Sequence, residues 1–200
     1  MENYQKKLDR IIDGLDGRPR LALHSCCAPC SSYVLEYLSQ YFDITLFYYN
    51  PNIYPAEEYE HRLREQLRLC ELLHIKTHPC AYDPKRYFDY VKGLENEPEG
   101  GARCTKCFEL RLDYTAALAK QLDFPLLTTT LTISPHKNAP LINTIGEKTA
   151  EKYGITWLPG DFKKKNGYLR SIQLCKEYDI YRQNYCGCKF SIWDDSEKTE

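Results

Sequence analysis

The sequence lacks any run of about 18 apolar residues, the length that a helix needs to span a membrane. Its start, Met1 to Lys7, lacks the apolar stretch of a secretory signal. These two absences disfavour membrane and exported proteins. We therefore expect a cytoplasmic protein whose thiols stay reduced, and structural disulfides are disfavoured for the same reason.

Two further absences narrow the chemistry. Neither the Gly-x-Gly-x-x-Gly pattern nor the Walker pattern occurs, which disfavours a nicotinamide enzyme and a P-loop nucleotide enzyme. The formal net charge is only −1, so the charge of the whole chain predicts no polyanionic partner. The chain has no internal repeat and no low-complexity segment.

Cysteine, in contrast, is abundant and clustered. Seven of the ten cysteines fall in three short motifs: Cys26, Cys27 and Cys30; Cys104 and Cys107; Cys186 and Cys188. Thiolates are soft ligands, and this spacing suits an iron–sulfur cluster or zinc. One [4Fe–4S] cluster takes about four thiolates. The surplus could hold a second metal, form a redox dithiol or have no role.

The order of apolar segments predicts an α/β fold. We expect a single domain over residues 1–200, with an N-terminal helix over 1–18, an α/β core over 20–158 and an extension over 159–195 that completes the metal site. Residues from Ser196 onward are polar, and we expect them to fray. Strands are predicted at 20–25, 44–49, 75–80, 124–131 and 155–158. Helices are predicted from about Ser31, over 55–74, 104–122 and 141–153, and from Gly167. Ser31 or Ser32 is the expected N-cap of the first of these helices. Such alternation predicts a parallel sheet covered by helices on both faces.

The carboxyl edge of that sheet is where ligands bind in folds of this type. Cys26, Cys27 and Cys30 follow the first strand, and His136 and Lys137 follow the fourth. We expect the side chains of the adjacent residues Cys26 and Cys27 to diverge, so that they cannot easily chelate one zinc ion. They could serve two different metals.

The other two motifs also suit a metal site. Cys104 and Cys107 lie one turn apart at a helix start, where the helix dipole favours thiolate. Gly187 lets the chain turn so that Cys186 and Cys188 both point inward. We predict that the three motifs converge on one site.

The remaining candidates have structural interpretations. Cys70 and Cys175 lie on apolar helix faces and are interpreted as core thiols, and Cys80 is interpreted as structural. His24 fits a packed histidine and a ligand equally well. His136, in a loop, is the better functional candidate.

The segment 161–189 mixes basic residues with tyrosines. Such a mixture can hold phosphates and stack bases, as in RNA-binding proteins. The alternative interpretation is a solvated helix face with half-buried tyrosines.

Several motifs together resemble the epoxyqueuosine reductase family called QueH, over roughly residues 20 to 193. The matching segments are His24-Ser25-Cys26-Cys27-Ala28-Pro29-Cys30-Ser31, Arg103-Cys104-Thr105-Lys106-Cys107-Phe108, Thr128-Thr129-Thr130-Leu131 with Ser134-Pro135-His136-Lys137, and Arg182-Gln183-Asn184-Tyr185-Cys186-Gly187-Cys188. The resemblance implies a cobalamin-independent iron–sulfur oxidoreductase. Its reaction would be the reduction of epoxyqueuosine to queuosine at the tRNA wobble position, the last step of queuosine biosynthesis.

The resemblance also implies a HUP or Rossmann-like fold of the adenine nucleotide α-hydrolase type. Relatives that transfer sulfur to tRNA with ATP carry a Ser-Gly-Gly loop after the first strand, and this chain has Ser25-Cys26-Cys27-Ala28 there. Some family relatives carry an acid at the position of Cys30. An ATP-dependent sulfur-transfer enzyme and a zinc-binding RNA module remain the alternatives.

From the motifs and the resemblance together we expect a [4Fe–4S] cluster and a possible mononuclear iron. The cluster ligands are expected among Cys26, Cys27, Cys104, Cys107, Cys186 and Cys188, with Cys30 as a further metal ligand. His136 is the candidate proton donor. An external electron donor is required, because no flavin or nicotinamide signature is present. The substrate tRNA is expected to contact Lys163, Lys164, Lys165 and Arg170.

Overall fold

The computed structural model describes residues 3–192, and the predicted fraying from Ser196 onward and the last residues of the expected extension, 193–195, lie outside these. Five parallel strands form one sheet in the order β3-β2-β1-β4-β5. Their bounds are Arg20–His24 for β1, Asp43–Phe47 for β2, Lys76–His78 for β3, Leu126–Thr129 for β4 and Thr156–Trp157 for β5. The predicted parallel sheet is therefore confirmed.

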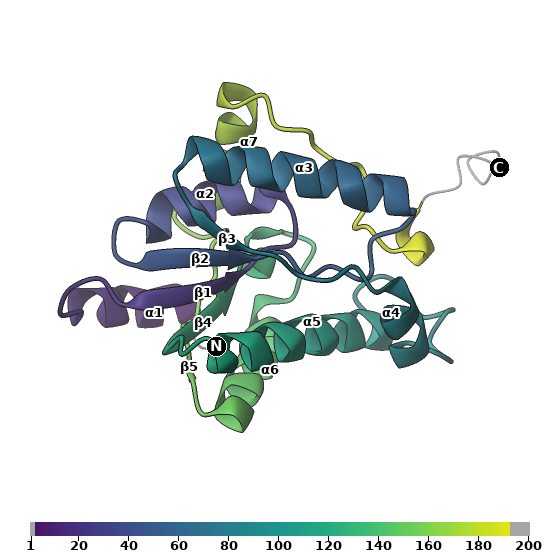
Figure 1. The fold of residues 1–200 in the computed structure, drawn as a ribbon, viewed down its shortest axis with the longest axis horizontal. Coiled ribbons are helices and arrows are strands. Elements are labelled where there is room, and N and C mark those ends of the chain that lie inside the picture. The colour runs from purple at the N-terminus through teal and green to yellow at the C-terminus, as the bar shows by residue number, and fades with distance from the viewer. Residues whose placement is uncertain (1–2, 193–200) are drawn as a thin grey trace.

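Helices cover both faces of the sheet, as Figure 1 shows: α2, α3 and α7 lie on one side, and α5 and α6 lie on the other. The helices are α1 (Tyr4–Asp13), α2 (Ala28–Leu38), α3 (Ala56–Leu72), α4 (Pro84–Tyr90), α5 (Ala102–Gln121), α6 (Ala139–Tyr153) and α7 (Gly167–Glu177), with short 3₁₀ turns η1 (Thr130–Ile133) and η2 (Lys189–Ser191). None of the helices along residues 3–192 combines the length and the apolar character needed to cross a bilayer.

Buried strands form the middle of the sheet because their side chains are apolar on both faces. Leu23 of β1 is paired with Leu46 of β2 and with Thr128 of β4 in the ladder. One apolar core fills the space under α2, α3 and α7, and a second fills the space under α5 and α6. The central strand β1 therefore has a fixed position, which fixes the loop that follows it.

Two predicted elements need correction, and one helix was not predicted. Helix α2 begins at Ala28 and not near Ser31, because Pro29 suits a first helical turn and the extended residue Cys27 precedes it as N-cap. The predicted strand over 124–131 ends at Thr129, where the chain enters η1. Helix α4 was not predicted; its N-cap is Asp83, whose side chain accepts a hydrogen bond from the Arg86 amide at 3.1 Å.

Candidate metal centre

The thiols gather where the strand order reverses. The chain moves from β1 outward to β2 and β3, but β4 and β5 lie on the other side of β1, so the switch point lies between β1 and β4. In open α/β sheets this is the place where ligands bind, outside the carboxyl ends of the strands. Cys26 follows β1 after one residue, and η1 follows β4 directly.

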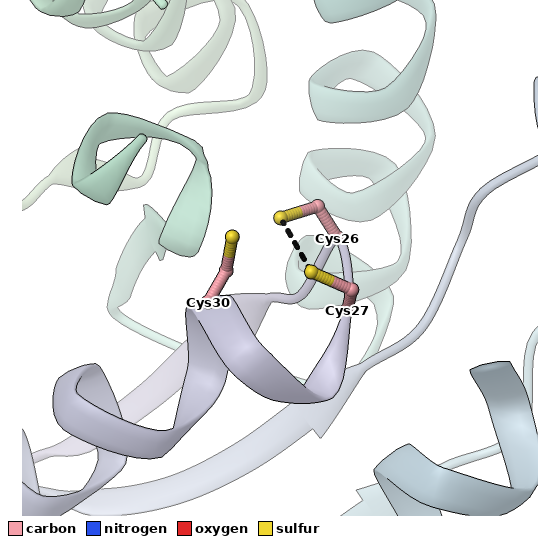
Figure 2. A group of neighbouring side chains, drawn as sticks. All are labelled: Cys26, Cys27 and Cys30. Carbon is pink, nitrogen blue, oxygen red and sulfur yellow. Dashed lines mark hydrogen bonds between the residues drawn. The ribbon is translucent and has the colours of Figure 1, made fainter. Parts of the chain in front are cut away.

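Cys26, Cys27 and Cys30 form a compact trio of sulfurs. Their Sγ atoms all lie within 4.8 Å of one another, and those of Cys26 and Cys27 are 3.9 Å apart. Figure 2 shows the three side chains pointing toward a common space at the start of α2. The prediction that Cys26 and Cys27 diverge is wrong. Cys27 is extended and the chain turns into α2 directly after it, and this turn brings the two sulfurs together.

Neighbouring polar groups hold the trio in place. The Thr130 hydroxyl donates to Cys26 Sγ at 3.3 Å and accepts from the Cys26 amide at 3.1 Å, which ties the loop after β1 to η1. The Gln183 amide Nε2 donates to Cys27 Sγ at 3.0 Å. Both contacts leave the sulfurs as acceptors, as metal-binding thiolates must be.

The thiols of the trio also differ from one another in pKa. Hydrogen bonds from the thiols of Cys27 and Cys30 lower the pKa of Cys26, and the charges of Lys137 and Arg111 act in the same direction. The hydrogen bond to Cys26 raises the pKa of Cys27 to about 12. In the metal-free trio the first negative charge therefore resides on Cys26.

Cys104 and Cys107 lie in the first two turns of α5, as predicted. The Gly100 amide donates to Cys104 Sγ at 3.2 Å. Cys107 is buried, and Arg111 Nη1 lies 3.9 Å from its sulfur. Burial raises the pKa of the Cys107 thiol to about 12, so desolvation outweighs the expected effect of the helix terminus.

Cys186 and Cys188 flank a sharp turn. Gly187 has a φ of +132°, a conformation that side chains rarely adopt. The Gly187 carbonyl accepts from the Tyr54 amide at 2.8 Å, and the Cys186 carbonyl accepts from Arg62 Nη1 at 3.2 Å. These bonds fix the turn beside the start of α3.

The yellow C-terminal segment runs close to α4 in Figure 1, and Cys30 and Cys186 line one cavity. Cys107 and Cys188 share one packed cluster with Tyr49 and Tyr87. Burial raises the pKa of Cys104, and negative charge on Cys186 and Cys188 acts in the same direction. Among the residues that the structure describes, however, only the trio after β1 has three sulfurs within 4.8 Å.

A cavity of about 550 Å³ opens beside the trio. Cys30 and Cys186 are in its wall, together with the loop 133–137, Tyr168 and the segment 182–186. Its size is in the range that takes a small-molecule or nucleoside group. His136 lines it from an exposed position, and the His136 amide donates to the Ser134 hydroxyl at 3.3 Å.

Lys137 lines the same cavity from closer to the thiols. Burial acts to lower the pKa of Lys137, but the negative charges of Cys186, Cys26 and Cys30 outweigh it and raise the pKa above the ordinary value. The ammonium group therefore remains charged beside the sulfurs.

His24 is buried with both ring nitrogens occupied. Nδ1 lies 2.8 Å from the Thr129 hydroxyl and Nε2 lies 3.3 Å from the Tyr49 carbonyl. Burial lowers the pKa of His24 to about 3, which keeps it neutral. Of its two interpretations, these contacts favour the packed histidine.

The cations predicted to contact tRNA are mostly paired with acids. Lys163 pairs with Asp161 at 2.5 Å, and Lys165 pairs with Asp9 at 2.7 Å. Arg170 lies between Glu36 and Glu177, at 2.7 and 2.6 Å. Lys164 is exposed, and the structure gives it no ion pair within residues 3–192.

The polar residues that touch the sulfurs were not predicted from the sequence. Arg111 follows Cys107 by four positions on one helix, a spacing that places both on the same face and could have identified it. Thr130 and Gln183 lie inside the motifs quoted above, but their contacts with sulfur join segments 104 and 156 positions apart. All ten cysteines are free thiols, and Cys70 and Cys175 are buried, as predicted.

Comparison with known proteins supports both the fold and the family. The model of the family described as epoxyqueuosine reductase QueH matches residues 21–194. The chain is 48% identical over 196 residues to an epoxyqueuosine reductase QueH of Streptococcus pyogenes, covering 95% of this chain and 77% of the relative. It is 36% identical over 179 residues to that of Thermotoga maritima, covering 88% of this chain and 92% of the relative.

A solved structure has the same fold. The U34-tRNA thiolase NcsA of Methanococcus maripaludis, determined with its [4Fe–4S] cluster, superposes with a TM-score of 0.58 at 15% identity, over 95% of this chain and 67% of the thiolase. At that identity the likeness concerns the fold alone.

Proposed function

This chain belongs to the epoxyqueuosine reductase QueH family, and we propose on that basis that it reduces epoxyqueuosine to queuosine at the wobble position of tRNA. This is the last step of queuosine biosynthesis. The observation that carries the proposal is the combination of three thiols, Cys26, Cys27 and Cys30, at the sheet's switch point with a cavity walled by Cys30 and Cys186.

The reaction sets clear requirements. Converting an epoxide into an alkene consumes two electrons and two protons and releases the oxygen as water. A [4Fe–4S] cluster, when bound, supplies electrons singly after receiving them from an external donor. The protein must therefore hold the modified base in the cavity, keep bulk water out and provide protons.

The donor set fits iron–sulfur chemistry, and its geometry indicates how the thiols divide. In a tetrahedral site with metal–sulfur bonds of about 2.3 Å, neighbouring sulfurs lie roughly 3.8 Å apart. The sulfurs of Cys26 and Cys27, 3.9 Å apart, are close to that spacing, and the Cys30 sulfur lies within 4.8 Å of both. We assign the trio to a single metal ion, the mononuclear iron. The remaining four thiols match the number that one cluster takes: Cys104, Cys107, Cys186 and Cys188.

Two side chains of the cavity suit the handling of protons and charge. His136 is exposed in the cavity wall and is our candidate proton donor to the departing oxygen. Lys137, charged and beside the thiols, would stabilise negative charge that develops on that oxygen.

The rim of the cavity suits the anticodon loop. Arg182, Asn184 and Tyr185 line it, which combines a cation, an amide and an aromatic ring. Lys164 is exposed and can bind a phosphate without first leaving a carboxylate partner. Lys163, Lys165 and Arg170 would exchange a carboxylate partner for a phosphate.

Turnover of the substrate tests the function directly. Anaerobically reconstituted protein, a tRNA carrying epoxyqueuosine and a chemical one-electron reductant should give queuosine without ATP, as measured by mass spectrometry of the nucleosides. A requirement for ATP would favour the sulfur-transfer alternative. Full activity of a zinc-loaded, iron-free protein would exclude iron–sulfur chemistry.

A further inference from the structure

Arg111 is a buried cation that lies among the thiols, and the proposed reaction gives it no role. It is 2% exposed and lies one turn after Cys107 on α5. Its Nη1 lies 3.9 Å from Cys107 Sγ, and its Nη2 donates to the side-chain oxygen of Asn50. The buried Nε has no hydrogen-bond partner.

None of these contacts is with a carboxylate. Within residues 3–192, the structure gives Arg111 no acidic partner, whereas the equally buried Arg62 pairs with Glu58 at 2.7 Å. A charge buried without a counter-ion is strongly unfavourable. The anion that offsets this guanidinium must therefore come from another source.

The thiols are that source once they are ionised as metal ligands, and Cys107 Sγ lies 3.9 Å from the guanidinium. Burial acts to lower the pKa of Arg111, but negative charge on Cys107, Cys26 and Cys186 raises it above the ordinary value. These three cysteines come from three different motifs. The guanidinium is thus a common counter-charge for sulfurs that are distant in the sequence.

Arg111 also joins two of the motifs mechanically. Asn50, which accepts from Nη2, donates its own amide to the Ser25 carbonyl at 2.9 Å. Ser25 directly precedes Cys26. A chain of side-chain contacts therefore runs from Cys107 on α5 to the loop after β1.

We propose that Arg111 is the internal counter-charge of the metal centre, a positioning residue that stabilises the reduced, more negative state of the bound cluster. The inference rests on the proposed iron–sulfur function. One electron from an external donor increases the negative charge of the centre by one. A fixed cation in a poorly solvated environment favours that state more strongly than one in water.

The matched variants are Arg111→Gln, which removes the charge, and Arg111→Lys, which keeps it. Each protein is reconstituted anaerobically, analysed for iron and sulfide, and titrated with dithionite at controlled potential, with the reduced cluster followed by electron paramagnetic resonance. Arg111→Gln should disfavour reduction at least tenfold, a shift of about 59 mV to lower potential for a one-electron couple. Arg111→Lys should disfavour it by less than threefold.

The outcomes separate the two hypotheses. An unchanged potential in Arg111→Gln, or an equal shift in Arg111→Lys, would overturn the role of the charge. Loss of iron in Arg111→Gln alone would support it, since the cation is then needed to hold the cluster at all, whereas loss in both variants would overturn it. A wild-type protein that takes up no iron would instead refute the proposed function.

Discussion

Cys107 and Cys70 are both buried cysteines on α-helices, yet their surroundings differ. Cys107 faces the Arg111 guanidinium and packs with Cys188. Cys70 faces the neutral Gln66 amide at 3.4 Å inside the main core, and burial raises its pKa to about 11. Burial raises the pKa of both thiols, but only Cys107 has a cation beside it, and that cation would favour the thiolate that a metal binds.

Removal of these thiols should therefore have different effects. Cys104→Ala or Cys107→Ala should lose the cluster and the activity together, because each removes a proposed thiolate ligand. Cys70→Ala and Cys175→Ala should keep both and lose roughly 1–2 kcal/mol of stability through a small cavity. Iron analysis and thermal unfolding measure these effects. Bleaching in Cys70→Ala with normal colour in Cys104→Ala would reverse the assignment.

A variant at Cys30 tests whether the thiols divide into three ligands of one metal ion and four ligands of the cluster. If the trio holds one metal ion, Cys30→Ala should release about one iron per chain and leave the absorption of the four-iron cluster nearly intact. Activity should fall sharply. Loss of the whole cluster in Cys30→Ala would place this thiol among the cluster ligands and refute the division.

At the scale of elements, α7 is held close to α2 by a glycine. A Cβ atom on Gly167 would lie 2.0 Å from the Phe162 carbonyl and 2.3 Å from the Tyr33 ring. Gly167→Ala should therefore destabilise the protein by roughly 1–3 kcal/mol through overpacking, as measured by denaturant unfolding. Gly14→Ala, whose Cβ would make an ordinary 3.6 Å contact, is the control. Equal stabilities would mean that α7 packs less tightly than the structure shows.

The loop before α7 carries three of the residues predicted to contact phosphate. Their ion pairs with acids indicate which of them is most available to a phosphate group. Lys164 has no acid to give up, whereas Lys165 is held by Asp9. Lys164→Ala should weaken tRNA binding and flatten its log–log salt dependence by about 0.7 to 0.9, with iron content unchanged. Lys165→Ala should have a smaller effect. Filter binding across a salt series measures both. An unchanged slope in the Lys163, Lys164 and Lys165 triple alanine variant would show that the tRNA binds elsewhere.

At the scale of the whole molecule, the concentration of thiols at one end predicts the colour of the protein. Anaerobically purified protein should be brown and hold about four irons or more per chain, since a four-iron cluster requires that number. Quantification of iron, sulfide and zinc with an absorption spectrum measures this. Colourless, zinc-loaded protein with full activity would be incompatible with the proposal.

Much of this architecture could be predicted without coordinates. The alternation of apolar segments predicted the parallel sheet, and the position of Cys26 after the first strand predicted the edge at which the thiols lie. Boundaries were less accurate. Helix α2 starts three residues before the expected position, and the seven-residue helix α4 is too short to give a clear periodic pattern.

The sequence by itself determined which atoms are available: seven clustered thiols, no phosphate loop, and strands that bring Cys26 and His136 to one edge. Periodicity and spacing are local, so they encode the elements and their order. Only the tertiary structure decided the convergence of Cys26 with Cys27, the pairing of Lys165 with Asp9, and the place of Arg111 among sulfurs from three segments. The pairing of Lys165 and the place of Arg111 depend on distances between residues far apart along the chain, and on burial, which makes an uncompensated charge costly. The convergence of the two adjacent cysteines depends on the turn into α2 that follows them.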